Sequence, residues 1–141
     1  MEEILFRGKK VNGDEWIEGL FVEAKKHAGR QIVLMFSKDG VHKVWRDTVG
    51  QYIGRRYSKG TEIFEGDVIR IDNCFSIENF NWCIRWDSLN AVFALARKRI
   101  KSPDWGARDD GYIYFQIPTD DIKRAKKIGN IHDNPELLEN K

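Results

Sequence analysis

The chain has 141 residues, of which 41% are hydrophobic, 33% charged and 12% aromatic. This composition excludes a disordered chain, and the length fits one domain or a core with a small appendage. With 24 basic and 22 acidic residues the net charge is +2, so only local clusters of charge can indicate a nucleic-acid partner.

The first half of the chain predicts short strands separated by tight turns. Residues 3–9 and 15–24 flank the pair Asn12-Gly13, which favours a hairpin because both residues tolerate a positive φ. Residues 30–37, "RQIVLMFS", form an apolar run typical of a central strand. We expect Asp39-Gly40 to turn the chain into a further strand over residues 41–47.

The second half continues this pattern. Extended segments are predicted over several stretches, namely 48–56, 67–72, 81–87 and 112–117. Residues 90–100 are ambiguous, because their Ala and Leu favour a helix, but Ala91, Phe93 and Leu95 also alternate, and we predict a strand. Residues 101–111 are expected to form an exposed loop rich in turn-forming residues.

Two short helical segments are expected near the end of the chain. Residues 119–127 begin with Thr119 as an N-cap and carry acidic residues first and basic residues last, which suits the helix dipole. In the tail, Asn134 is the expected N-cap and Pro135 the first helical residue. The sequence therefore predicts a mostly β protein, either a barrel or curved antiparallel sheets, with a short C-terminal helical turn.

The stretch "KGTEIFEGDVIR" places Glu65-Gly66-Asp67 between two apolar runs. The pair of acids could serve catalysis or hold a cation. Alternatively, Gly66 supplies a positive φ and Asp67 binds nearby backbone N–H groups. We favour the second interpretation, because two carboxylates in one turn without a third oxygen donor make a poor metal site.

No catalytic or metal-ligating pattern emerges. Cys74 and Cys83 form no CxxC motif and are expected to be buried thiols, and the three histidines lie far apart, at 27, 42 and 132. We therefore expect that the protein is not an enzyme and that it binds neither a metal nor a cofactor. An enzyme would have to bring together the remaining polar candidates, which are Asp67, Asp109, Asp110 and His132.

The strongest candidate for a functional surface is basic. Five cations and one acid, Asp104, give a net charge of +4 between residues 97 and 108, and Trp105 lies in the same segment. These cations are Arg97, Lys98, Arg99, Lys101 and Arg108. A second basic run spans 123–127. Cations beside an exposed aromatic residue suit a phosphate backbone and a stacked base. The alternative is an edge strand on which Lys and Arg prevent unwanted pairing.

Three stretches together resemble the YopX family of phage and prophage proteins. They are "EILFRGKKVNGDEWIEGLF", "TVGQYIGRRYSKGTEIFEGDVIR" and "IGNIHDNPELLEN", and they extend from residue 3 to residue 140. The residues that carry the last two motifs are Gly50, Gln51, Tyr52, Glu65, Gly66, Asp67, Gly129, Asn130, Asn134 and Pro135. One departure is visible: the loop "RRYSKG" stands where relatives commonly have Leu-Lys-Asp-Lys-Asn-Gly, although Gly60 is kept.

This resemblance implies an SH3-like β-barrel and a phage-derived origin, but no activity. We expect one domain over residues 1–141, in which 71–127 match no family motif and either complete the barrel or form a second subdomain. The first ten residues contain no long apolar stretch, so we expect no membrane association and a location in the host cytoplasm.

The functional hypothesis is a non-enzymatic binding module that engages nucleic acid through the 97–127 face, or engages a phage or host protein. The alternative is a homo-oligomeric interaction protein.

Overall fold

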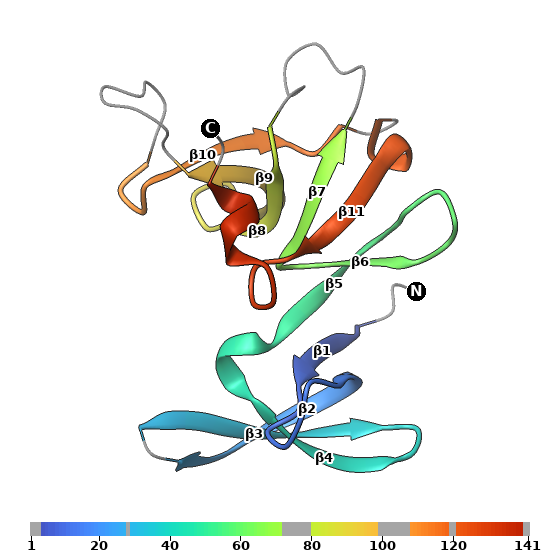
Figure 1. The fold of residues 1–141 in the computed structure, drawn as a ribbon, viewed down its shortest axis with the longest axis vertical. Helices are drawn as coiled ribbons and strands as arrows, with labels where there is room; N and C mark the ends of the chain where they lie inside the picture. Colours follow the sequence, from blue (N-terminus) through green and yellow to red (C-terminus); the bar gives the residue numbers. More distant parts are fainter. Residues whose placement is uncertain (1–3, 28, 72–79, 99–107, 119–120, 140–141) are drawn as a thin grey trace. The chain divides into compact units, whose positions relative to one another are not determined.

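The computed structural model describes residues 4–27, 29–71, 80–98, 108–118 and 121–139, with the side chains of 23–27, 121 and 123 left aside. These residues form eleven strands and three short 3-10 helices (Figure 1). The prediction of a mostly β protein built from antiparallel sheets is therefore confirmed. Among the described residues, no helix approaches the length and apolar character that crossing a membrane requires.

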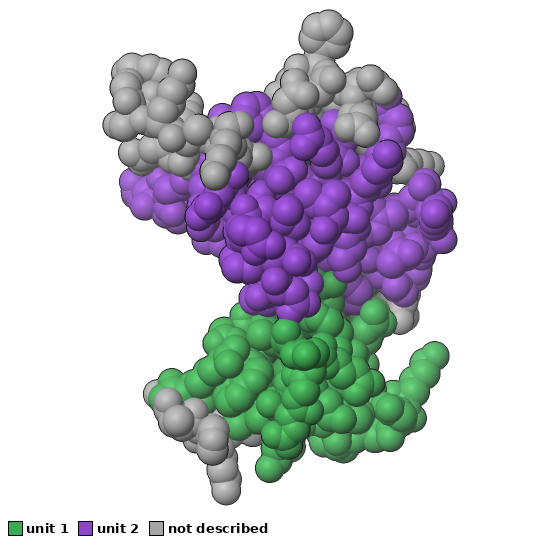
Figure 2. All heavy atoms as spheres, in the orientation of Figure 1, with its two compact units in different colours: residues 1–54 green, residues 55–141 purple. Residues whose placement is uncertain are grey.

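The chain divides into two compact units, residues 1–54 and 55–141 (Figure 2). The boundary falls within the strand β5 (Gly50–Arg56), so this strand passes from one unit into the other. A single domain over 1–141 stays a prediction. The described strands of residues 71–127 belong to one sheet of the second unit, together with strands on either side of that segment.

The strands of the first unit belong to a six-stranded antiparallel sheet with the order β4-β3-β2-β1-β5-β6, whose last strand, β6 (Glu62–Phe64), follows in the second unit. The elements of the first unit are β1 (Phe6–Lys9), β2 (Trp16–His27), β3 (Arg30–Ser37), β4 (Gly40–Trp45), the 3-10 helix η1 (Arg46–Thr48) and the start of β5. The core consists of the buried residues Ile17, Val33, Met35 and Val44, with Phe6, Phe21 and Val49 packed against them. The predicted hairpin at Asp39-Gly40 is confirmed by the pairing of Ser37 with Gly40.

The sheet of the first unit is curled. Lys10, just after β1, makes a single bridge with Val44 of β4, and the Val11 N–H donates to the Lys43 carbonyl at 2.9 Å. This contact brings β1 and β4 together around the core without a continuous ladder. The described strands close neither sheet into a barrel, so the SH3-like barrel remains a prediction.

Gly19 marks the point at which β2 changes partner. Residues 16–19 pair with β1, and the pairing with β3 begins at Leu20 opposite Phe36. A Cβ at position 19 would lie against the backbone oxygen of Phe36, well inside van der Waals contact. Only glycine therefore allows the two strands to approach so closely at this bend.

The second unit contains a five-stranded antiparallel sheet with the order β10-β9-β8-β7-β11. Its elements are β6 (Glu62–Phe64), which follows β5, then β7 (Asp67–Ile71), β8 (Trp82–Asp87), β9 (Val92–Lys98), β10 (Tyr112–Gln116), the 3-10 helix η2 (Asp121–Arg124), β11 (Ala125–Asn130) and the 3-10 helix η3 (Pro135–Leu138). The strand predicted within residues 90–100 is confirmed by β9.

The C-terminal helical turn closes one face of this sheet. Leu138 of η3 is 4% exposed and packs with Val68, Cys83 and Ala96 from β7, β8 and β9. Asn134 stands at the N-cap and Pro135 begins the turn, as predicted, but the Asn134 side chain makes no cap hydrogen bond. Its side-chain oxygen instead accepts the Asn130 N–H at 3.3 Å, since it lies against the end of β11.

The helix expected over 119–127 is largely replaced by a strand. Only the 3-10 turn η2 is helical, and Thr119 lies outside the described residues. Lys126 and Lys127 belong to β11, where they pair with Arg70 and Ile69 of β7. Strand pairing and the burial of Ala125 therefore outweigh the local match between charge and helix dipole.

The bend at Gly19 gives a prediction for stability. Gly19→Ala should lower the free energy of unfolding by about 3 kcal/mol or more, because backbone rather than a movable side chain blocks the new methyl group. Urea unfolding followed by Trp fluorescence measures this change. Asp14→Ala, at a fully exposed site before β2, should change the value by less than about 0.5 kcal/mol. Equal effects of the two substitutions would contradict the close approach.

Candidate anion-binding pocket

The Glu65-Gly66-Asp67 corner is built around a fully buried carboxylate. Gly66 has a φ of +96°, and Asp67 is 0% exposed. The Asp67 Oδ2 accepts hydrogen bonds from the Phe64 N–H at 3.0 Å and from the Tyr57 hydroxyl at 2.9 Å. The Lys127 ammonium lies 3.3 Å from Oδ1. The interpretation of this segment as a structural corner, with Asp67 bound to nearby backbone, is confirmed.

The corner is joined directly to the C-terminal tail. The Gly66 carbonyl accepts the Ile131 N–H at 2.9 Å, while the Gly66 N–H donates to the Ile84 carbonyl at 2.7 Å. Asp67 and Asn130 are paired residues of β7 and β11. Two motifs that are far apart in the sequence therefore meet at one place in the fold.

Asn130 organises the turn after β11. Its side chain is 7% exposed, and its oxygen accepts the N–H groups of His132 and Asp133, each at 2.9 Å. A Cβ at the neighbouring Gly129 would come within 2.8 Å of the Leu137 side chain, so glycine leaves room for the tail to fold back. Asn130 and Gly129 therefore have a structural role, since they allow the tail to fold back after β11.

The motif residues of β5 also have structural contacts. Gly50 and Gln51 pair with Arg7 and Phe6 of β1, and the Tyr52 N–H donates to the Leu5 carbonyl at 2.7 Å. Tyr52 itself is 8% exposed. This part of the motif therefore holds β5 against β1.

Comparison with known families agrees with this geometry. The sequence model of the family described as YopX protein matches residues 5–139. The chain belongs to the YopX family. A search of curated proteins found no match to it. In this YopX chain, the residues that carry the family resemblance surround the Asp67 corner, the β1–β5 pairing and the tail.

Two of the residues that hold Asp67 also line a pocket of about 570 Å³ in the second unit. We call it the basic pocket, and its lining residues are Tyr57, Ser58, Lys59, Thr61, Arg124, Ala125, Lys126 and Lys127. One wall is the turn between β5 and β6, which is closed by hydrogen bonds from the Tyr57 N–H to the Thr61 carbonyl and from the Gly60 N–H to the Tyr57 carbonyl, both 2.9 Å. The other wall is the end of η2 and the first half of β11.

The lining of the basic pocket is strongly positive. It contains three lysines and one arginine, all four exposed, and no carboxylate. The nearby acid Asp67 is bound by Lys127, and Glu62 forms an ion pair with Arg56 at 3.1 Å. The hydroxyl groups of Ser58 and Thr61 add neutral hydrogen-bonding groups. A ligand that carries several negative oxygens matches this arrangement.

The sequence pointed to only half of this pocket. The basic run at 123–127 supplies Arg124, Lys126 and Lys127, but the contribution of Lys59 was not foreseen. The feature of the sequence that could have indicated this contribution is the loop "RRYSKG". It departs from the family resemblance and contains Tyr57, Ser58 and Lys59.

The other predicted basic segment is engaged in packing where the structure describes it. The Arg97 guanidinium of β9 lies 4.5 Å from the ring centre of Phe80 and 5.9 Å from that of Trp82. Lys98 is exposed at the end of β9. Three of the predicted site residues lie outside the described residues, namely Arg99, Lys101 and Trp105.

Arg108 forms a bidentate ion pair with Asp87, whose side chain is 3% exposed. The hydrogen bonds from Arg108 are the main reason that the pKa of Asp87 falls to about 2. The same guanidinium lies 4.4 Å from the ring centre of Tyr114. Through these contacts Arg108 joins β8 to the start of β10.

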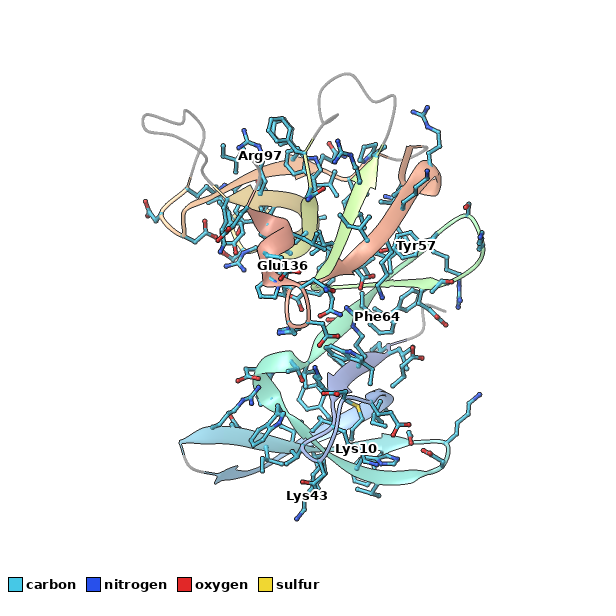
Figure 3. All side chains as sticks on the ribbon, viewed as in Figure 1. Lys10, Lys43, Tyr57, Phe64, Arg97 and Glu136 are labelled. Carbon is cyan, nitrogen blue, oxygen red and sulfur yellow. The ribbon has the colours of Figure 1, made fainter. Side chains whose placement is uncertain are left out.

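The described cations of the two basic runs lie on strands that are not neighbours in the sheet. In the strand order, β8 and β7 separate β9 from β11, which corresponds to about 14 Å across the sheet. Figure 3 shows Arg97 beside β9 and β10, whereas Tyr57 lies beside β6 and β11. Arg97 and Lys98 are therefore separated across the sheet from Lys126 and Lys127.

The polar candidates for catalysis have different surroundings. Asp67 is bound in the corner, whereas Asp110 accepts hydrogen bonds from the Tyr112 N–H and the Tyr114 hydroxyl. Asp109 is exposed, and His132 follows β11. In the described part of the chain, no three His, Cys, Asp or Glu side chains are placed to hold a metal ion.

The expected burial of Cys83 is confirmed: the residue is 2% exposed, and burial raises the pKa of its thiol to about 11. Cys74 lies outside the described residues.

The pair of Arg108 and Asp87 gives a pH-dependent prediction. Because the pKa of Asp87 is lowered on folding, its contribution to stability is complete above about pH 4 and is lost as the pH falls to about 2. Arg108→Gln should lower stability at pH 5 and make the decline between about pH 4 and pH 2 smaller. Urea midpoints at several pH values measure both effects.

Lys98→Gln is the control for this experiment, because it removes an exposed cation from the same sheet. Its midpoints should follow those of the unmodified protein at every pH. A loss of stability in Arg108→Gln that stays constant from pH 5 to about pH 2 would show that the pair does not control this transition.

Proposed function

We propose that this YopX protein is a non-enzymatic module that binds nucleic acid through its basic pocket. The observation that carries the proposal is the gathering of four exposed cations, of which Lys127 is paired with Asp67, and two hydroxyl groups around one concavity of about 570 Å³. The setting that the family resemblance implies is the cytoplasm of a host cell that carries a phage or prophage. An SH3-like barrel would supply the scaffold.

The charge of the pocket favours phosphates as the recognised groups. Lysine ammonium groups are mobile point charges that bind phosphate oxygens, and arginine adds a planar fork of donors. The overall charge of +2 is too small to attract nucleic acid over the whole surface, so the local cluster must do so. We expect such binding to weaken steeply with salt, because each engaged phosphate releases a counterion.

The lining also favours binding over catalysis. It contains no histidine, cysteine or carboxylate, which are the usual groups for acid–base or nucleophilic steps. Its tyrosine donates its hydroxyl proton to the buried Asp67. The pocket therefore has the groups to hold an anion, and no histidine or carboxylate lines it to act as a general base for its serine and threonine hydroxyls.

The proposal is tested by fluorescence anisotropy with a labelled single-stranded DNA of about 12 nucleotides at about 50 and 200 mM salt. The double variant Lys59→Ala/Lys126→Ala should weaken binding by about tenfold or more and reduce the salt slope by about one to two. Both side chains are exposed, so the melting temperature should stay unchanged.

Lys98→Ala is the matched control, since it removes an exposed lysine from β9 outside the pocket. Its affinity should equal that of the unmodified protein. If only Lys98→Ala weakened binding, the interface would belong to the 97–108 segment. The absence of salt-sensitive binding to any nucleic acid at low salt would overturn the proposal.

One observation supports self-association as a second candidate function. Leu20, Phe36 and Val41 lie directly opposite one another across β2, β3 and β4, and their side chains are 56%, 46% and 56% exposed. Val22 extends this row and is 52% exposed. The other face of these strands carries the core, so the sheet is apolar on both faces, which is typical of a covered sheet.

A second copy of the chain is the proposed cover, because the row of Leu20, Phe36 and Val41 carries no charge and the exposed Lys43 lies in the neighbouring row. Light scattering over a range of concentrations should then show a dimer, and Leu20→Ser/Phe36→Ser should convert it to a monomer. Lys43→Ser, on the same face, serves as control and should leave the dimer intact. A monomer at every concentration would exclude this candidate.

A further inference from the structure

We infer that the basic pocket receives one nucleotide of a flexible strand and therefore selects single-stranded over duplex nucleic acid. This inference rests on the proposed function and specifies its ligand. It follows from three features of the pocket: its volume, the chemistry of its inner wall, and the way in which that wall is fixed.

The volume of about 570 Å³ is that of a site for a small organic molecule, not of a flat contact surface. A duplex turns its bases inward and stacks them, so it can lay phosphates across the rim but cannot insert a base or sugar. A single strand rotates freely about its backbone, and one of its nucleotides can enter. The concavity therefore contributes to binding only for a single strand.

The inner wall differs from the rim. Tyr57 and Ala125 are only 8% and 7% exposed, and they supply aromatic and methyl surface beneath the exposed cations. A nucleotide matches this arrangement, because it has a charged phosphate on one side and a flat, less polar base on the other. Free phosphate would use only the cations of the rim.

The inner wall is held in place by the fold. The Tyr57 hydroxyl donates to Asp67 at 2.9 Å, and the Lys127 ammonium lies 3.3 Å from the same carboxylate. Because Asp67 is fully buried and also accepts the Phe64 N–H, Tyr57 of the inner wall and Lys127 of the rim share one rigid anchor. A preformed wall loses little conformational entropy when a ligand enters.

The lining contains none of the acidic or amide side chains that commonly read base edges. Arg124 is its one planar donor group, and the remaining cations are lysines. We therefore expect at most a preference for guanine, which Arg and Lys bind through O6 and N7, with the strand form of the nucleic acid as the main determinant.

The test compares one labelled DNA of about 12 nucleotides as a single strand and as a duplex of the same sequence, at equal ionic strength. The single strand should bind about tenfold more tightly than the duplex. Adenosine 5′-monophosphate should displace it at a lower concentration than inorganic phosphate does, because only the nucleotide reaches the inner wall.

Ser58→Leu places a larger side chain in the lining and removes no charge. It should reduce single-strand affinity to the level of the duplex and leave duplex affinity unchanged. Ser88→Leu is the matched control, at an exposed serine in the turn after β8, and should alter neither affinity. Equal melting temperatures of the two variants would show that both are folded.

The outcomes separate this inference from the function on which it rests. Equal affinity for single strand and duplex, with both reduced by Lys59→Ala/Lys126→Ala, would overturn the single-strand inference and leave nucleic-acid binding in place. An unchanged preference in Ser58→Leu would likewise overturn the inference. No binding of either form at low salt would overturn both.

Discussion

The burial of one carboxylate constrains most of the second unit. Asp67 has no exposed surface, and a charge removed from water is costly unless donors surround it. Its donors come from three separate segments: Tyr57 after β5, Phe64 at the end of β6, and Lys127 in β11. The corner, the pairing of β7 with β11 and the wall of the basic pocket therefore each supply part of what keeps this charge stable.

Much of the fold could be predicted from the sequence because the relevant information is local. Alternating or continuous apolar runs identified strands such as those at 30–37 and 112–117, and the pair Asp39-Gly40 identified a hairpin. The corner at Gly66 was also predictable, because a positive φ and an acid that binds neighbouring backbone are properties of a few adjacent residues.

The basic pocket could not be predicted in this way, because Lys59 and Lys126 become neighbours only when β11 returns beside the turn before β6. The sequence instead suggested one basic face over residues 97–127. The strand order, however, separates the described cations of β9 from those of β11. The same limit explains Arg108: its partner Asp87 lies on another strand, so a cation that looked available in the sequence is held in an ion pair. In a β protein, the strand order decides which charged residues lie together, so a charge cluster in the sequence can be interpreted only once that order is known.

The distribution of family features within the second unit separates scaffold from surface. Gly66, Asp67 and Asn130 belong to the family motif and build the corner and the tail. Tyr57 and Lys59 lie between β5 and β6, in the loop "RRYSKG", where the chain departs from the family resemblance. A fixed corner can thus carry a variable pocket wall, because the turn needs only its closing glycine and backbone bonds. The ligand that we propose for the basic pocket accordingly depends on side chains of this loop, whereas Asp67 beneath it belongs to the stretch that carries the family resemblance.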